Sequence, residues 1–216
     1  CHPCAKSYSA AIAAAVRDGL KKQGNEVQCI SLYANSLEVL EDATVRGLPA
    51  PTKFSPALTE RERTHYYDVA KGNKGGLAPD VEKAVNLLRW CDALVLVYPT
   101  WWFNVPGALK GFFDRTFLPH VAFRLPDADV KDATDTGLVP MLTNIKKIGV
   151  VTTYGASKNV TLLAGDNGRQ MISRAFRPLF NPECPMVWMG LHAMHDKSQE
   201  QRSAFLDEVR ERFSRF

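Results

Sequence analysis

Three short, largely apolar runs constrain the fold of this chain more than any other feature. They are Ala93 to Tyr98, Ile148 to Thr153 and Met186 to Leu191. Apolar runs of this length without polar alternation are typical of strands that are buried on both faces of a sheet. Strands of this kind occur in parallel sheets that are covered by helices on both sides.

Segments with helical periodicity separate these runs. The sequence predicts helices at residues 9–22, 80–89, 104–117, 167–180 and from Ser198 to the end. Gln201 stands three residues after Ser198, the spacing of a capping box. A further segment, Glu26 to Leu32, alternates in polarity and predicts another strand. Strands that alternate with helices predict an α/β fold with a doubly wound parallel sheet, here in a single domain of residues 1–216.

Two longer segments, Tyr33 to Gly76 and Phe123 to Pro140, interrupt this alternation. The first is rich in glycine and proline, and it contains a predicted helix at Thr59–Val69 with a threonine cap. Long ordered loops in folds of this kind usually serve a binding site.

Composition excludes several classes of protein. The net charge of +4 comes from scattered lysines and arginines, which argues against a nucleic-acid partner. No apolar run reaches the roughly 18 residues needed to span a bilayer. The five cysteines are odd in number, which favours reduced thiols. With no visible signal peptide, the expectation is a cytoplasmic protein without a structural metal.

Ligands of open parallel sheets bind at the carboxyl ends of the strands. Three segments at such positions carry unusual residues: His2–Ser9, Pro99–Asn104 and Thr152–Gly155. The first offers serine hydroxyls and backbone amides at a helix start, which suits a phosphate, although an ordinary helix cap needs only one of those hydroxyls. The third offers hydroxyls and amides to an anionic or carbonyl edge, but such turns are common.

The middle segment, Pro99–Asn104, places two tryptophans and a phenylalanine directly after a buried strand, where the chain should enter a polar turn. A flat aromatic cofactor would explain this placement, because stacked rings gain free energy beyond the burial of area. Core packing and dimer packing are the alternatives, since aromatic residues also anchor interfaces.

Taken together, these segments resemble the NAD(P)H:quinone oxidoreductase family of flavodoxin-like flavoproteins. The most specific piece is PTWWFNVPGALKGFFDRTF, which begins at Pro99. His2-Pro3 with Ser7-Tyr8-Ser9 resembles the family's phosphate loop, and Thr152-Thr153-Tyr154-Gly155 resembles its Thr-Thr-x-Gly turn. The stretch FSPALTERERTHYYD at 54–68 is similar to the family segment after the second strand.

The resemblance implies a flavin, FAD or FMN, that takes hydride from NAD(P)H and passes it to a quinone-like acceptor, or to an azo or nitro compound, in a ping-pong cycle. The flavin performs the transfer, so no catalytic side chain is assigned. It also implies a homodimer that completes the acceptor pocket. The implied cofactor-binding residues are His2, Ser7, Tyr8, Ser9, Pro99, Thr100, Trp101, Trp102, Phe103, Asn104, Thr152, Thr153, Tyr154 and Gly155.

The chain departs from the family pattern in three places. Val160 and Asp166 stand where some members have a tyrosine and a histidine that stabilise the reduced flavin. Residues 38–53 look like an insertion. The family also begins with a strand at the centre of its sheet, whereas this sequence opens at Cys1. The expectation is an N-terminally shortened chain with that position in the sheet open or abnormally filled, and with weak cofactor binding.

Other functions remain open from the residues. Cys1 and Cys4 form a CxxC motif, which is typical of thiol–disulfide exchange. A non-catalytic electron carrier of the flavodoxin type and a redox sensor are further alternatives. The sequence does not choose between FAD and FMN or between NADH and NADPH.

Overall fold

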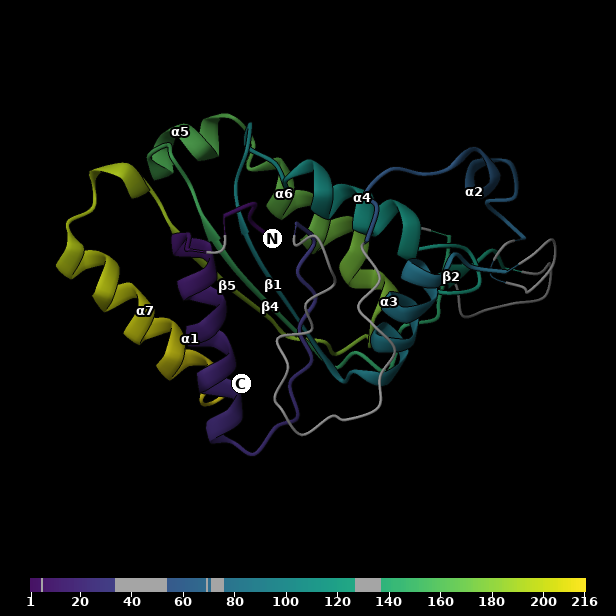
Figure 1. Cartoon of the computed structure of the whole chain (residues 1–216), viewed down its shortest axis with the longest axis horizontal. Helices are drawn as coiled ribbons and strands as arrows, with labels where there is room; N and C mark the ends of the chain where they lie inside the picture. Colours follow the sequence, from purple (N-terminus) through teal and green to yellow (C-terminus); the bar gives the residue numbers. More distant parts are fainter. Residues whose placement is uncertain (5, 34–53, 69, 71–75, 127–136) are drawn as a thin grey trace.

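The computed structural model describes residues 1–4, 6–33, 54–68, 70, 76–126 and 137–216. The predicted insertion at 38–53 lies outside these residues. At the centre is a parallel sheet of three strands: β1 (Ala93–Pro99), β4 (Lys147–Thr153) and β5 (Met186–Leu191), in the order β1-β4-β5 (Figure 1). Ala93 pairs with Lys147, and Ile148 pairs with Met186. The three apolar runs are therefore the three strands, as predicted.

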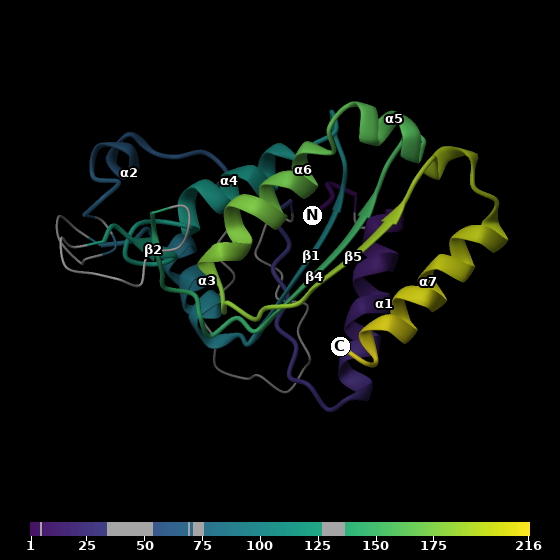
Figure 2. The same ribbon diagram turned by 180° about the vertical axis from the view of Figure 1, so that it is seen from behind.

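Helices cover both faces of this sheet (Figures 1 and 2). One face carries α1 (Tyr8–Lys22) and α7 (Gln199–Phe213), and the other carries α3 (Pro79–Trp90), α4 (Gly107–Thr116) and α6 (Asn167–Gln170). A π-helical turn (Met171–Phe176) and a 3-10 turn (Arg177–Leu179) continue α6. Leu96 and Tyr98 of β1 pack toward α3 and α4, whereas Val95 and Val97 pack toward α1 and α7. The strands are thus buried on both faces, and the predicted doubly wound α/β class is confirmed.

In the described parts of the two long loops the elements are short: α2 (Glu60–Thr64), β2 (Phe123–Arg124) and β3 (Val139–Pro140). α5 (Lys158–Leu163) follows β4, and a 3-10 turn (Met194–Asp196) follows β5. The predicted threonine cap at Thr59 is correct, because its hydroxyl accepts from the Glu62 amide and the Glu62 carboxylate accepts from the Thr59 amide. The predicted helix at Thr59–Val69 is too long, since α2 ends at Thr64.

The strand predicted at Glu26–Leu32 is wrong, because these residues have no strand pairing. A cavity of about 720 Å³ is lined both by residues 24–30 and by residues 93–97 of β1. A strand needs a neighbour for its backbone hydrogen bonds, and residues 26–32 form no ladder with β1. Within the described residues β1 is an edge strand of the sheet, and the Cys1 nitrogen donates to its Val97 carbonyl at 2.7 Å.

One buried cluster of charges ties the segment after residue 54 to α4. Arg115 is only 2% exposed, and its guanidinium donates to both oxygens of Glu62 and both oxygens of Asp80. It also donates to the Ser55 carbonyl at 2.5 Å and lies over the Phe54 ring. A planar guanidinium matches carboxylates in this forked way, which makes Arg115 the link between α2, α3 and α4.

This cluster predicts a specific acid sensitivity. Burial raises the pKa of Glu62 and of Asp80, but the Arg115 hydrogen bonds and charge outweigh it, so both pKa values lie below their ordinary ones. An acid whose pKa is lower in the folded state stabilises the fold at pH values above its unfolded pKa, which is about 4. This stabilisation is lost as the pH falls toward the folded-state pKa. The free energy of unfolding is expected to decline below about pH 5. Urea titrations at pH 7, 5 and 3.5 measure it, and a flat profile in that range would contradict the prediction.

Candidate functional site

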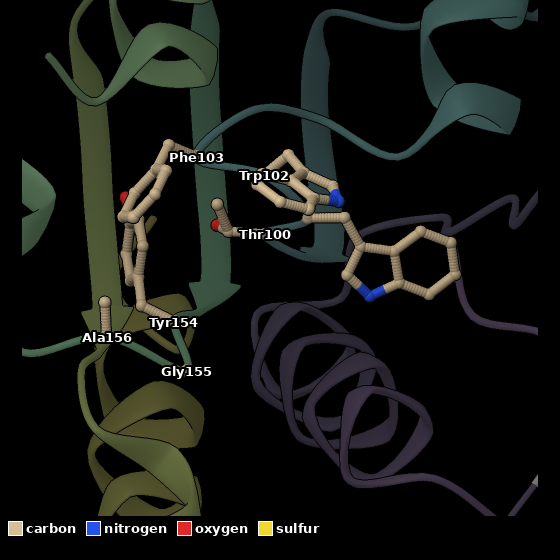
Figure 3. A pocket seen from close by; sticks show the side chains of 7 residues that line it. Thr100, Trp102, Phe103, Tyr154, Gly155 and Ala156 are labelled. Carbon is tan, nitrogen blue, oxygen red and sulfur yellow. The ribbon is translucent and has the colours of Figure 1, made fainter. Parts of the chain in front are cut away.

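A pocket of about 440 Å³ lies at the carboxyl ends of β1 and β4, where parallel sheets bind their ligands. Its volume falls in the range of roughly 300–1,000 Å³ that is usual for small-molecule sites. Phe103 and Tyr154 stand on one side of Thr100, and Trp102 stands on the other (Figure 3). The lining residues are Thr100, Trp101, Trp102, Phe103, Tyr154, Gly155 and Ala156.

The aromatic segment forms a tight four-residue turn. The amide of Trp101 donates to the Asn104 carbonyl, and the amide of Asn104 donates to the Trp101 carbonyl, both at 3.0 Å. Its central residues have positive φ angles, 51° at Trp102 and 57° at Phe103. Two-residue turns of this form favour Asn-Gly, and bulky side chains in them cost about 1–3 kcal/mol each. Trp102 is nevertheless 94% exposed, so the strain does not serve core packing.

The second predicted segment supplies the other wall of the pocket. Thr152 and Thr153 are buried within β4, and the Thr152 hydroxyl hydrogen-bonds that of Thr100 at 2.9 Å. Neither threonine lines the pocket; the Thr152 hydroxyl instead links the end of β4 to the end of β1. Tyr154, Gly155 and Ala156, which follow the threonines, line the pocket. Tyr154 does so with its ring, while its amide donates to the Leu191 carbonyl of β5.

The predicted phosphate loop lies at the start of α1, whose first turn is on the same edge of the sheet as the pocket (Figure 1). The Ser7 hydroxyl caps α1 by accepting from the Ala10 amide at 3.2 Å, and the Tyr8 hydroxyl donates to the Arg202 carbonyl of α7. Ser9 is buried, and His2 accepts from the Cys4 amide. None of His2, Ser7, Tyr8 or Ser9 lines the pocket, so their contact with a phosphate stays a prediction.

Three nearby residues were not predicted as part of the site. Ala156 lines the pocket directly. His192 stacks on the Tyr154 ring, with centroids 4.2 Å apart, and Asp166 accepts from the Tyr154 hydroxyl at 3.1 Å. His192 follows β5 immediately, so the rule that ligands meet strand carboxyl ends would have found it. Asp166 does not follow a strand, and the family resemblance marked its position only as a departure from the family pattern. Its contact with Tyr154 comes from the chain's return after α5.

Electrostatics around Tyr154 favour neutral rings. Burial, followed by the charge of Asp166, raises the pKa of Tyr154. Burial lowers the pKa of His192, although the Asp166 charge opposes this. The Thr161 hydroxyl donates to the Ser157 carbonyl and is therefore an acceptor for Nδ1 of His192 at 3.4 Å. These contacts hold the Tyr154 and His192 rings in place at the pocket wall.

The cysteines carry no disulfide in the part of the chain that the structure describes. Burial raises the pKa of Cys29, of Cys91 and of Cys184, which keeps these thiols protonated. Within the same residues, no cluster of three or more His, Cys, Asp or Glu side chains is placed to hold a metal ion, and no helix is long and apolar enough to cross a membrane.

The residues that line the pocket fit a flat aromatic ligand. Three aromatic side chains and the Tyr154 ring surround it, and the strained turn holds two of them outside the core. Hydroxyl and backbone groups of Thr100 and residues 154–156 provide polar contacts at one edge. A flavin ring has this combination of flat apolar faces and a polar edge.

Comparison with known proteins agrees with this geometry. The chain is 29% identical over 127 residues to human ribosyldihydronicotinamide dehydrogenase [quinone], a match that covers 58% of this chain and 52% of that protein. It is 28% identical over 118 residues to rat NAD(P)H dehydrogenase [quinone] 1, covering 54% and 40%. These matches span about half the length of the curated relatives.

Solved structures share the fold over nearly the whole chain. The NAD(P)H:quinone oxidoreductase from Methanothermobacter marburgensis superposes with a TM-score of 0.74 at 21% identity, covering 99% of this chain and 94% of that one. An FMN-dependent NADH-azoreductase from Bacillus anthracis str. Ames Ancestor, solved with FMN, gives a TM-score of 0.65 at 16% identity, covering 99% and 92%. Residues 1–215 match the family described as having a flavodoxin-like fold, and the chain belongs to that family.

Proposed function

We propose that this protein is a flavin-dependent oxidoreductase that accepts hydride from NAD(P)H and reduces quinone-like, azo or nitro compounds by two electrons in a ping-pong cycle. FAD or FMN is the cofactor, and a second copy of the chain completes the acceptor pocket. The observation that carries the proposal is the strained aromatic turn at Trp101–Asn104, which lines a pocket at the strand ends. Strain of this kind persists where a ligand site requires it.

The flavin supplies the hydride chemistry when it is bound, and the chain supplies binding and orientation. Trp102 and Phe103 offer ring faces, and Thr100, Gly155 and Ala156 offer polar and backbone contacts at the edge. The phosphate of the cofactor tail would bind the amides at the start of α1, near Ser7–Ser9. The positive end of the helix dipole lies there and favours a negative charge.

Cofactor release and turnover test this proposal directly. The protein is purified, heated, and the supernatant analysed for FMN and FAD by chromatography; apoprotein is then titrated with each flavin. Oxidation of NADH and of NADPH is followed with menadione as acceptor. Stoichiometric flavin with acceptor-dependent turnover supports the enzyme. Flavin without turnover would favour an electron carrier or sensor, and a Cys4→Ser variant that abolishes activity would favour thiol chemistry.

Removal of the exposed tryptophan ring is expected to weaken flavin binding. The substitution Trp102→Ala should raise the dissociation constant for FMN roughly tenfold, because an aromatic stack contributes about 0.5–1.5 kcal/mol beyond area burial. Quenching of FMN fluorescence measures it. Trp90→Ala is the matched control, since Trp90 is also exposed but ends α3 outside the pocket. Equal affinities of the two variants would contradict a stacking role for Trp102.

A further inference from the structure

Asp166 is a buried acid next to the pocket, and the function proposed above does not use it. Asp166 is only 6% exposed. The carboxylate accepts from the Tyr154 hydroxyl at 3.1 and 3.3 Å, and Tyr154 lines the pocket. Among the residues that the structure describes, no cation forms an ion pair with it. A buried acid is normally paired, so this one invites explanation.

A structural role in capping does not explain Asp166. It stands at the N-cap position of α6, where an aspartate usually accepts from the first amides of the helix. Here the side chain makes no such bond, and the backbone is left-handed, with φ at 44°. The carboxylate instead accepts from the Tyr154 hydroxyl.

No basic side chain among the described residues contacts the Asp166 carboxylate in an ion pair. The nearest basic residue on α6, Arg169, lies over the Trp188 ring at 5.4 Å. His192 after β5 stacks on the Tyr154 ring and feels the Asp166 charge only through space. Burial raises the pKa of Tyr98 of β1, which is therefore a neutral phenol. Because α6 packs tightly on the aromatic turn, with the Gly168 amide 3.4 Å from the Phe103 carbonyl, the acid is held close to the pocket wall.

We propose that Asp166 tunes the redox state of the bound cofactor: its negative charge weakens the binding of the reduced flavin relative to the oxidised flavin. The proposal rests on the flavin function proposed above. Reduction adds electrons to the ring system, and a fixed negative charge in a medium of low dielectric constant opposes added negative charge. Asp166 is therefore a tuning residue and does not itself transfer hydride.

The test is the midpoint potential of bound FMN at pH 8, measured by equilibration with a reference dye. In Asp166→Asn, the affinity for reduced FMN relative to oxidised FMN is expected to rise about tenfold, which is about 30 mV more positive for a two-electron couple. Asparagine keeps the shape, accepts from the Tyr154 hydroxyl, and tolerates the left-handed backbone. The matched control is Asp207→Asn, which removes an exposed acid on α7 and should leave the potential unchanged.

Tyr154→Phe separates charge from hydrogen bonding. It removes the donor but keeps the Asp166 charge, so its potential should shift less than that of Asp166→Asn. An unchanged potential in Asp166→Asn, or a larger shift in Tyr154→Phe, would overturn the proposal. Failure of the wild-type protein to bind FMN or FAD would instead reject the flavin function itself, which fluorescence titration of the wild type detects before any variant is compared.

Discussion

Replacement of Arg115 by methionine is expected to lower the free energy of unfolding by about 3–5 kcal/mol at pH 7, because it leaves two buried carboxylates without their cation. Glu62 and Asp80 lie at 2.6 and 2.5 Å from the guanidinium, and both are buried. Methionine retains much of the side-chain volume, so the loss reports the charges more than a cavity. Urea unfolding followed by circular dichroism measures it.

The control for this variant is Arg210→Met on α7. Arg210 pairs with Asp207 at 2.5 Å on the surface, where an ion pair contributes at most about 1 kcal/mol. The Arg115 variant also has a pH signature. Without the cation, burial raises the pKa of both acids, so they bind protons and lose their charge in acid. The destabilisation should therefore be smaller at pH 4.5 than at pH 7, and an equal loss at both values would refute the charge explanation.

Addition of a single methyl group at Gly111 is the second large effect that the structure predicts. A Cβ at this position would overlap the Pro56 carbonyl, a backbone group that cannot turn away. Gly111→Ala should destabilise the protein by about 3 kcal/mol, at the upper end of overpacking costs, because α4 must move away from the segment it contacts. Thermal unfolding should show this loss, and FMN affinity should also fall because α4 follows the aromatic turn directly.

Gly107→Ala provides the matched control within the same helix. No atom lies within 4 Å of a Cβ at Gly107, so the methyl group has space. Alanine also loses less conformational entropy than glycine on entering a helix, which predicts an unchanged or slightly raised stability. Equal stabilities of the Gly111 and Gly107 variants would mean that the close approach to Pro56 does not limit α4.

Much of the fold follows from local patterns in the sequence. The strands β1, β4 and β5 coincide with its apolar runs, and the caps at Thr59 and Ser198 are correct to the residue. These elements could be predicted because an apolar run and a helix cap each depend on residues that are close together in the sequence. The segment at 26–32 shows the limit of this reasoning. Its alternation suits a strand, yet a strand also needs a paired neighbour, and residues 26–32 pair with none of the described strands.

Part of the site was also predictable. The aromatic residues at 101–103 and the turn at 154–155 were identified by their position after buried strands, and they line one pocket. The predicted contacts of Ser7, Tyr8 and Ser9 with a phosphate stay untested. What the sequence concealed was the positive φ at Trp102 and Phe103, because backbone strain arises from the tertiary contacts that hold the turn.

The sequence by itself determined the parallel α/β architecture and the aromatic position at the strand ends, since periodicity and strand-end chemistry are properties of contiguous residues. Only the tertiary structure decided that Arg115 joins Glu62 to Asp80, and that Asp166 meets Tyr154. These partners are distant along the chain, and their charges matter because folding removes them from water, which no local pattern records.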